Sequence, residues 1–125
     1  MSRPRNVGIF DLMQYRFPVM AVVSIFHRIT GVLLLIYLPL VLYYWHRSLI
    51  DAAGFSQVQQ LLMQLYGKFF LWLLLSAFWY HVLAGLKHVV MDFGFWESLK
   101  AAKISSWGVI ILGMIGAVLL GVWVC

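Results

Sequence analysis

Charged side chains are scarce in this chain. Asp, Glu, Lys and Arg together make up 10% of its 125 residues, whereas 64% are hydrophobic. A soluble domain of this length could not bury so much apolar surface, so the composition indicates a membrane protein. The net charge of +5 comes from basic residues around the hydrophobic segments rather than from one patch. We therefore expect contact with membrane lipid headgroups and no nucleic-acid partner.

Cysteine is nearly absent, since Cys125 is the only one. This excludes an intrachain disulfide, and an iron–sulfur cluster or zinc site built from several thiolates of this chain. Motifs for flavin or nicotinamide binding are also missing. The first long apolar segment begins near Val19 and is too long for the core of a signal peptide, so we expect no cleavable leader.

Three apolar segments are long enough to cross a bilayer as helices: residues 19–44, 69–90 and 104–124. The sequence therefore predicts an all-α membrane protein with three transmembrane helices. We expect a single membrane-anchor domain over residues 1–125, in which residues 1–18 form a cytoplasmic tail.

The connections and the third span add two weaker signals. Turn-forming residues begin at Asp51 in the first connection, and glutamines follow, so a short amphipathic helix is expected there. In the third span Gly113, Ala117 and Gly121 recur at a spacing of four. Such a ridge of small side chains permits close contact with a neighbouring helix.

Lys and Arg are unequally distributed around the three spans. The N-terminal tail and the second connection hold six of them: Arg3, Arg5, Arg16, Lys87, Lys100 and Lys103. The first connection has only Arg47 and Lys68, and none follows the third span. Because basic residues are retained on the cytoplasmic side, we expect the N-terminus in the cytoplasm and the C-terminus outside.

His81 is the ionisable residue that lies deepest in a predicted span. Between residues 69 and 86 the only polar side chains are Ser76, Tyr80 and His81. The histidine would lie about 18 Å from the outer boundary and about 12 Å from the inner one. An ionisable group at that depth is costly and is by default functional. A neutral imidazole can bind haem iron, and the small residues Ala77 and Gly85, four residues either side, would leave room for a macrocycle. The alternative is a histidine that only bonds a neighbouring helix.

Arg28 would lie about 6 Å closer to the cytoplasm than His81. That offset suits a haem propionate, because a guanidinium forms paired bonds to a carboxylate. The alternative is an arginine that extends to the inner surface. Ser24 is four residues before Arg28 and shares its helix face, so the two side chains together could hydrogen-bond the carbonyl oxygen of a quinone.

A haem in such a bundle usually needs two axial ligands. His27 is the other internal candidate, so a His27–His81 pair within the chain is conceivable, but a ligand from another subunit is preferred. His88 follows His81 by seven residues and reaches the inner boundary, where it could approach a propionate. Lys87 is expected to extend outward at that level.

Two blocks of residues resemble those of a known family. The first runs Ser24-Ile25-Phe26-His27-Arg28-Ile29-Thr30-Gly31, after Arg3-Pro4 in the tail. The second runs His81-x-x-x-Gly85-Leu86-Lys87-His88-x-x-x-Asp92-Phe93-Gly94. In order and within a three-span chain, these blocks resemble the cytochrome b556 subunit of succinate dehydrogenase, the larger membrane anchor of respiratory Complex II. Lys87 is a departure, since many members have arginine there.

The resemblance implies a haem-binding bundle that is shared with a small hydrophobic anchor subunit. It implies that His81 is an axial ligand of one haem b and that the small anchor supplies the opposite histidine. His27 and Arg28 would approach the propionates. Ser24 and Arg28 would line a ubiquinone site that the iron–sulfur subunit and the small anchor complete.

It further implies a subunit of an electron-transport enzyme of the tricarboxylic acid cycle, in the inner membrane of a bacterium with the C-terminus in the periplasm. Succinate and flavin would bind a separate flavoprotein subunit, so this chain alone lacks the succinate-oxidising site.

Other functions remain open from the sequence. The chain could anchor a quinol:fumarate reductase, because the direction of electron flow depends on the quinone and on the partner subunits. It could also be a haem-free membrane anchor or assembly protein, in which the histidines and Arg28 only join helices. A channel or transporter subunit is disfavoured, because the third span carries no charged residue.

Overall fold

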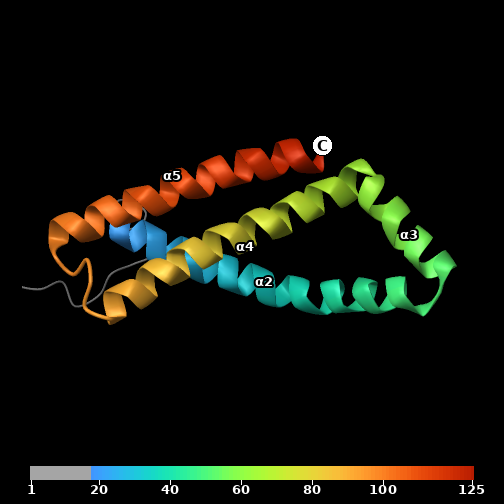
Figure 1. The fold of residues 1–125 in the computed structure, drawn as a ribbon, viewed down its shortest axis with the longest axis horizontal. Helices are drawn as coiled ribbons and strands as arrows, with labels where there is room; N and C mark the ends of the chain where they lie inside the picture. The colour runs from blue at the N-terminus through green and yellow to red at the C-terminus, as the bar shows by residue number, and fades with distance from the viewer. Residues whose placement is uncertain (1–17) are drawn as a thin grey trace, which may run out of the picture.

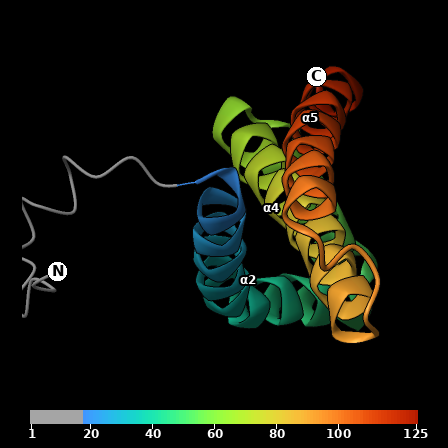
Figure 2. The ribbon, with the colours of Figure 1, turned by 90° about the vertical axis from the view of Figure 1, so that its left-hand side faces the viewer.

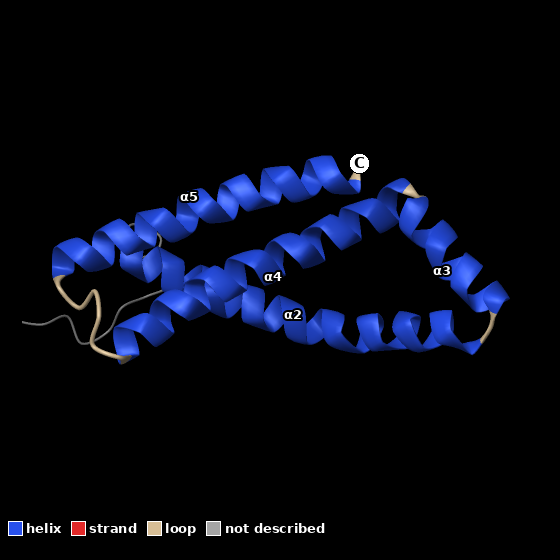
Figure 3. Cartoon of the chain, viewed as in Figure 1, coloured by secondary structure: helices blue, strands red, loops and turns tan. Residues whose placement is uncertain are grey.

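The computed structural model describes residues 18–125, and within them the chain is helical with short connections (Figure 3). The helices are α2 (Val19–Ile50), α3 (Ala52–Met63), α4 (Leu65–Asp92) and α5 (Leu99–Val124). Three of them, α2, α4 and α5, are long and apolar enough to cross a membrane. This confirms the predicted all-α architecture with three membrane-spanning helices.

Each long helix extends beyond the apolar run that predicted it. Helix α2 begins as expected at Val19, but it continues to Ile50, and α4 begins at Leu65 and ends at Asp92. The edge of an apolar segment does not by itself end a helix; α2 continues through Pro39 and ends at its cap, Asp51. The span limits 19–44, 69–90 and 104–124 therefore stay predictions. The predicted tail, with Arg3, Arg5 and Arg16, lies outside the described residues apart from Pro18.

The amphipathic helix expected in the first connection is confirmed as α3. Asp51 ends α2 in an extended conformation and caps α3, where its side chain accepts a hydrogen bond from Gly54 N at 2.6 Å. Such a cap satisfies a backbone donor at the start of the helix. Gly54 lies against the Arg47 carbonyl and Gly67 against the Leu61 backbone, so closely that neither position has room for a Cβ. The two glycines allow the chain to turn twice within a few residues.

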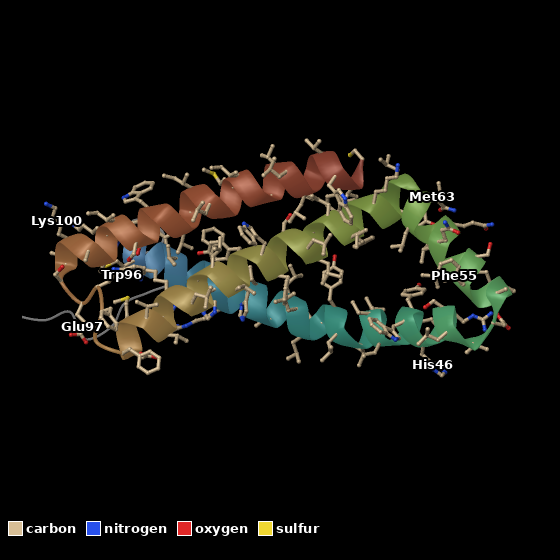
Figure 4. The ribbon with its side chains drawn as sticks, in the orientation of Figure 1. His46, Phe55, Met63, Trp96, Glu97 and Lys100 are labelled. Atoms are coloured by element: carbon tan, nitrogen blue, oxygen red, sulfur yellow. The ribbon has the colours of Figure 1, made fainter. Side chains whose placement is uncertain are left out.

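The three long helices are not parallel to one another (Figure 1). In Figure 1 helices α2 and α4 cross and then diverge toward α3, which joins them. Figure 2 shows α4 between α2 and α5, in keeping with the contacts that α4 makes to both. Below, "the α3 end" means the end where α2, α3 and α4 meet, and "the loop end" means the end of the α4–α5 connection. Figure 4 shows His46, Phe55 and Met63 at the first, and Trp96, Glu97 and Lys100 at the second.

Helices α4 and α5 approach closely along the small-residue ridge predicted in the third span. Trp72 Nε1 donates to the Ala117 carbonyl at 2.8 Å, and Trp79 Nε1 donates to the Leu112 carbonyl at 2.9 Å. The Tyr80 ring lies against Gly113. Indole N–H groups that reach a backbone carbonyl need the small residues beside them, because larger side chains would hold the helices apart.

All three long helices meet in one small apolar core. Val23 of α2 and Ala84 of α4 are fully buried, and Val109 of α5 is nearly so. Tyr80 reaches across from α4 and donates its hydroxyl to the Val23 carbonyl at 3.0 Å. This core fixes α2 against α4 one to two turns from the histidines of both helices.

Gly116 gives a direct test of the α4–α5 contact. Any Cβ at Gly116 would collide with the Trp79 indole, whereas a Cβ at Gly108 would meet nothing within 4 Å. We expect Gly116→Leu to destabilise the bundle by about 1–3 kcal/mol through overpacking. Thermal unfolding of the purified protein in detergent measures the effect, with Gly108→Leu as the matched control. Equal melting temperatures for the two variants would contradict this helix packing.

Candidate functional site

Three histidines from two helices form a stack between α2 and α4. The His27 ring lies 4.2 Å from the His81 ring and 5.0 Å from the His88 ring, centroid to centroid, with interplanar angles of 21° and 19°. His27 comes from α2, whereas His81 and His88 are seven residues apart on one face of α4. We call these residues the histidine stack. The structure thus brings together the three histidines that the sequence singled out.

One ring nitrogen of His81 is held by α2. Its Nδ1 lies 3.2 Å from the His27 carbonyl oxygen and 3.1 Å from Thr30 Oγ1. The Thr30 hydroxyl in turn donates to the His27 carbonyl at 2.9 Å. Because both neighbours of Nδ1 can accept, the proton of the neutral imidazole belongs on Nδ1. The lone pair then lies on Nε2, which makes no hydrogen bond within residues 18–125.

The role of Thr30 was missed by the sequence reasoning, although a signal was present. Thr30 follows His27 by three residues, the spacing at which a hydroxyl bonds the preceding turn of its own helix. That local bond turns the hydroxyl oxygen toward α4. What the sequence could not give is the register of α2 on α4, which places His81 opposite this turn.

Two glycines face the stacked rings, and the contact at Gly31 is the tighter one. A Cβ at Gly31 would lie 3.2 Å from His81 Cε1, and a Cβ at Gly85 would lie 3.5 Å from His27 Nε2. The sequence reasoning reserved the space at Gly85 for a macrocycle; here the His27 ring lies against Gly85, and the use of that space by a macrocycle stays a prediction. The stacking also leaves no space for a macrocycle between His27 and His81, as axial ligands from the same chain would require.

Ser24 and Arg28 lie on α2 close to the stack but outside it. Arg28 is exposed and Ser24 is half-buried, and neither contacts His81 or His88 through a hydrogen bond. They are four residues apart and so share a face of the helix. His88 has its own partner, since its Nδ1 lies 2.6 Å from the Ala84 carbonyl of the preceding turn.

Lys87 does not extend outward as the sequence suggested. Its side chain is 5% exposed, and its ammonium donates to Met91 Sδ at 3.1 Å. On α4 it follows Ala84, part of the three-helix core, by one turn, so the same face is buried. The expectation failed because it used depth in the membrane alone, whereas the rotation of α4 against its neighbours decides which side chains are covered.

An apolar groove adjoins the histidine stack. Its volume is about 550 Å³, and it is lined by Gly31, Leu34, Leu35, Tyr37, Leu38, Val41, Leu74, Leu75 and Phe78. Gly31 links the groove to the stack, because it also faces the His81 ring. Within residues 18–125 no three or more His, Cys, Asp or Glu side chains, the histidine stack included, are arranged so that they could hold a metal ion among themselves. A haem, however, needs only one histidine from this chain if another subunit supplies the second.

The residues of this chain fit the half of a haem site that one chain would supply: one histidine ligand and one apolar wall. Metal-binding histidines usually donate their second ring nitrogen to a carbonyl or similar group, which fixes the tautomer and the ring orientation. His81 has that arrangement through Nδ1. A flat apolar macrocycle also needs apolar walls, which the adjoining groove supplies.

Three long apolar helices with a histidine stack between two of them define a multi-pass membrane protein with a polar seam inside an apolar bundle. The chain belongs to the family described as succinate dehydrogenase/fumarate reductase transmembrane subunit, whose model matches residues 2–120. The match covers nearly the whole chain, including both histidine-bearing helices.

Named relatives agree with this membership. A protein of Coxiella burnetii (strain RSA 493 / Nine Mile phase I) is 42% identical over 125 residues, which is 99% of each chain. One of Paracoccus denitrificans is 32% identical over 108 residues, covering 86% of this chain and 83% of the relative. One of Rickettsia bellii (strain RML369-C) is 28% identical over 110 residues, covering 88% and 84%. Each is named succinate dehydrogenase cytochrome b556 subunit.

The burial of Lys87 can be tested by removing its charge. An ammonium that is 5% exposed and bonded to a thioether is poorly compensated for the loss of water. We expect Lys87→Met to leave the free energy of unfolding of the assembled complex unchanged or to raise it by up to about 1–3 kcal/mol, which is measured as a rise in melting temperature. Lys103→Met, at an exposed position, is the control. A lower melting temperature for Lys87→Met than for Lys103→Met would contradict this expectation and would show that the ammonium has an anionic partner in the complex.

Proposed function

We propose that this chain is the haem-binding membrane anchor of a succinate:ubiquinone oxidoreductase. The observation that carries the proposal is the state of His81, whose Nδ1 is bonded to α2 while its Nε2 makes no hydrogen bond within residues 18–125. An imidazole whose Nδ1 is hydrogen-bonded and whose Nε2 keeps its lone pair is suited to bind iron. Membership of the family supports the assignment to this complex.

His81 would be one axial ligand of a single haem b. His27 stacks on the His81 ring at 4.2 Å, so we do not assign His27 as the second ligand. The second axial histidine is therefore assigned to another chain, the small hydrophobic anchor subunit. When bound, the haem supplies a one-electron carrier close to the quinone site.

The polar end of the haem would face the loop end of the bundle. Three residues of α2 and α4 lie toward the loop end from His81 or level with it: His27, Arg28 and His88. Their ring nitrogens and the guanidinium are the groups that bond carboxylates. They would hold the propionates, while the apolar groove on the other side of Gly31 would take the hydrocarbon edge.

Ser24 and Arg28 would bind the ubiquinone. They share one face of α2, and the Arg28 side chain is exposed, so a ligand can reach it from outside the chain. A hydroxyl and a guanidinium hydrogen-bond a carbonyl oxygen, and the cation stabilises the negative charge that develops on it during reduction. The iron–sulfur subunit and the small anchor would complete the site.

In the assembled enzyme, electrons from succinate would enter through the flavoprotein and iron–sulfur subunits and reach ubiquinone at the membrane. The relatives' names favour the succinate dehydrogenase direction, although the family description also covers fumarate reductases. The loop end would lie on the cytoplasmic side of a bacterial inner membrane, an orientation that the distribution of Lys and Arg supports. A haem-free anchor remains the rival, and the reduced-minus-oxidised visible spectrum of the complex separates the two.

His81→Ala is expected to remove haem b from the assembled complex. Haem is quantified per flavin, so that recovery of complex and loss of haem are separated. His46→Ala is the control, because His46 is an exposed histidine at the α3 end. Normal haem content in His81→Ala would rule out the ligand role.

Thr30→Val tests the bond behind the ligand. It removes the hydroxyl near His81 Nδ1 while keeping the shape of the side chain. Loss of such a supporting bond weakens metal-site affinity about 10- to 100-fold, so we expect weaker haem retention, restored by Thr30→Ser. Identical retention in Thr30→Val and wild type would show that the hydroxyl does not support His81.

Arg28→Ala is expected to lower ubiquinone reduction by about 10- to 100-fold, the effect of losing a charge-assisted hydrogen bond of about 1.5–3 kcal/mol. Succinate oxidation with a soluble artificial acceptor should persist, because that reaction does not use the membrane site. Arg28→Lys, which keeps the charge but not the paired geometry, should fall between. Equal loss of both activities in Arg28→Ala would contradict a quinone role.

A further inference from the structure

A separate apolar cavity lies at the α3 end, and we call it the α3 cavity. Its volume is about 470 Å³. Its walls come from α2 between Tyr37 and Ser48, from α4 between Tyr66 and Leu74, and from Val58, Leu61 and Leu62 of α3. The lining residues belong to the three helices that meet at this end, where Figure 1 shows α2 and α4 diverging toward α3.

The α3 cavity is unfavourable both for water molecules and as an empty space. Water needs two or more polar partners, and this lining is almost wholly aliphatic and aromatic. An empty space of this size would cost the surrounding side chains their dispersion contacts on one side. A flexible apolar group from the surroundings is the natural occupant.

Along α4 the lining of the α3 cavity runs from Tyr66 to Leu74, a length of about 12 Å. A single hydrocarbon chain is narrow enough, and the bilayer surrounds the bundle with such chains.

Polar and aromatic groups gather at the end of the α3 cavity nearest to α3. Tyr44, Trp45 and Tyr66 are there, and aromatic side chains of this kind mark the membrane interface. Arg47, beside the lining residue Ser48, donates to the uncharged Gln57 Oε1 at 3.0 Å. The acidic residue nearest in sequence, Asp51, is occupied with capping α3. The guanidinium thus keeps its charge available for an anion at headgroup level.

We propose that the α3 cavity binds one acyl chain of a membrane phospholipid and that Arg47 binds its phosphate. The apolar walls match the chain, the aromatic residues match the glycerol level, and the guanidinium matches the phosphate. A quinone tail is a poorer match, because a quinone has no anionic group. The proposed quinone residues are also far away: Arg28 is twenty residues before Ser48 on α2, about 30 Å.

The proposal is tested on the whole complex by native mass spectrometry. The complex is released from mild detergent, and bound phospholipid and quinone are identified by mass. Wild type should retain at least one phospholipid that resists washing with added detergent. Val58→Trp fills the α3 cavity and should reduce this retention at least tenfold. Val118→Trp makes the same change on an exposed face of α5 and should not.

Arg47→Gln provides an independent variant that leaves the apolar walls intact. It should lower phospholipid retention about five- to tenfold, and this result decides the matter if Val58→Trp fails to assemble. Wild type without bound phospholipid would overturn the proposal, whether quinone or a partner's side chain fills the cavity. Equal loss in Val58→Trp and Val118→Trp, or full retention in Arg47→Gln, would overturn it too.

Discussion

The contact between His81 Nδ1 and the turn of α2 at His27 and Thr30 is the interaction on which the candidate site depends. It joins the two helices at their polar seam and places the ring proton on the nitrogen that faces α2. The lone pair of the other nitrogen is then directed away from that turn. In an apolar bundle such a satisfied polar contact also supports the register of the helices, because a slip would leave the ring nitrogen and the hydroxyl without partners.

Contacts elsewhere in the bundle hold α2, α4 and α5 in this register. Trp72 and Trp79 hold α5 against α4 through backbone carbonyls, and Tyr80 reaches from α4 to the Val23 carbonyl of α2. These side chains leave α4 on faces other than that of His81. Helix α4 therefore carries a structural interface on one side and the histidine stack on another. The α5 helix, which has no charged residue after Lys103, takes no part in the stack.

The sequence predicted which segments form helices and which polar residues they carry, but not how each helix is rotated against its neighbours. Three apolar runs were enough to identify α2, α4 and α5, because length and hydropathy suffice in a membrane. The spacing of His81 and His88 correctly predicted a shared face. The burial of Lys87 and the position of His27 beside Gly85 were not predictable, since both depend on how α2 turns against α4. The contact of Thr30 with His81 needed the same information.

The most direct measurement is a density map of the assembled complex in the membrane, resolved well enough to place the His81 ring. We predict His81 Nε2 bonded to the iron of a haem, with Nδ1 still at hydrogen-bonding distance from the His27 carbonyl or the Thr30 hydroxyl. A map in which the His81 ring touches only protein, with no macrocycle beside α2 and α4, would contradict the central claim.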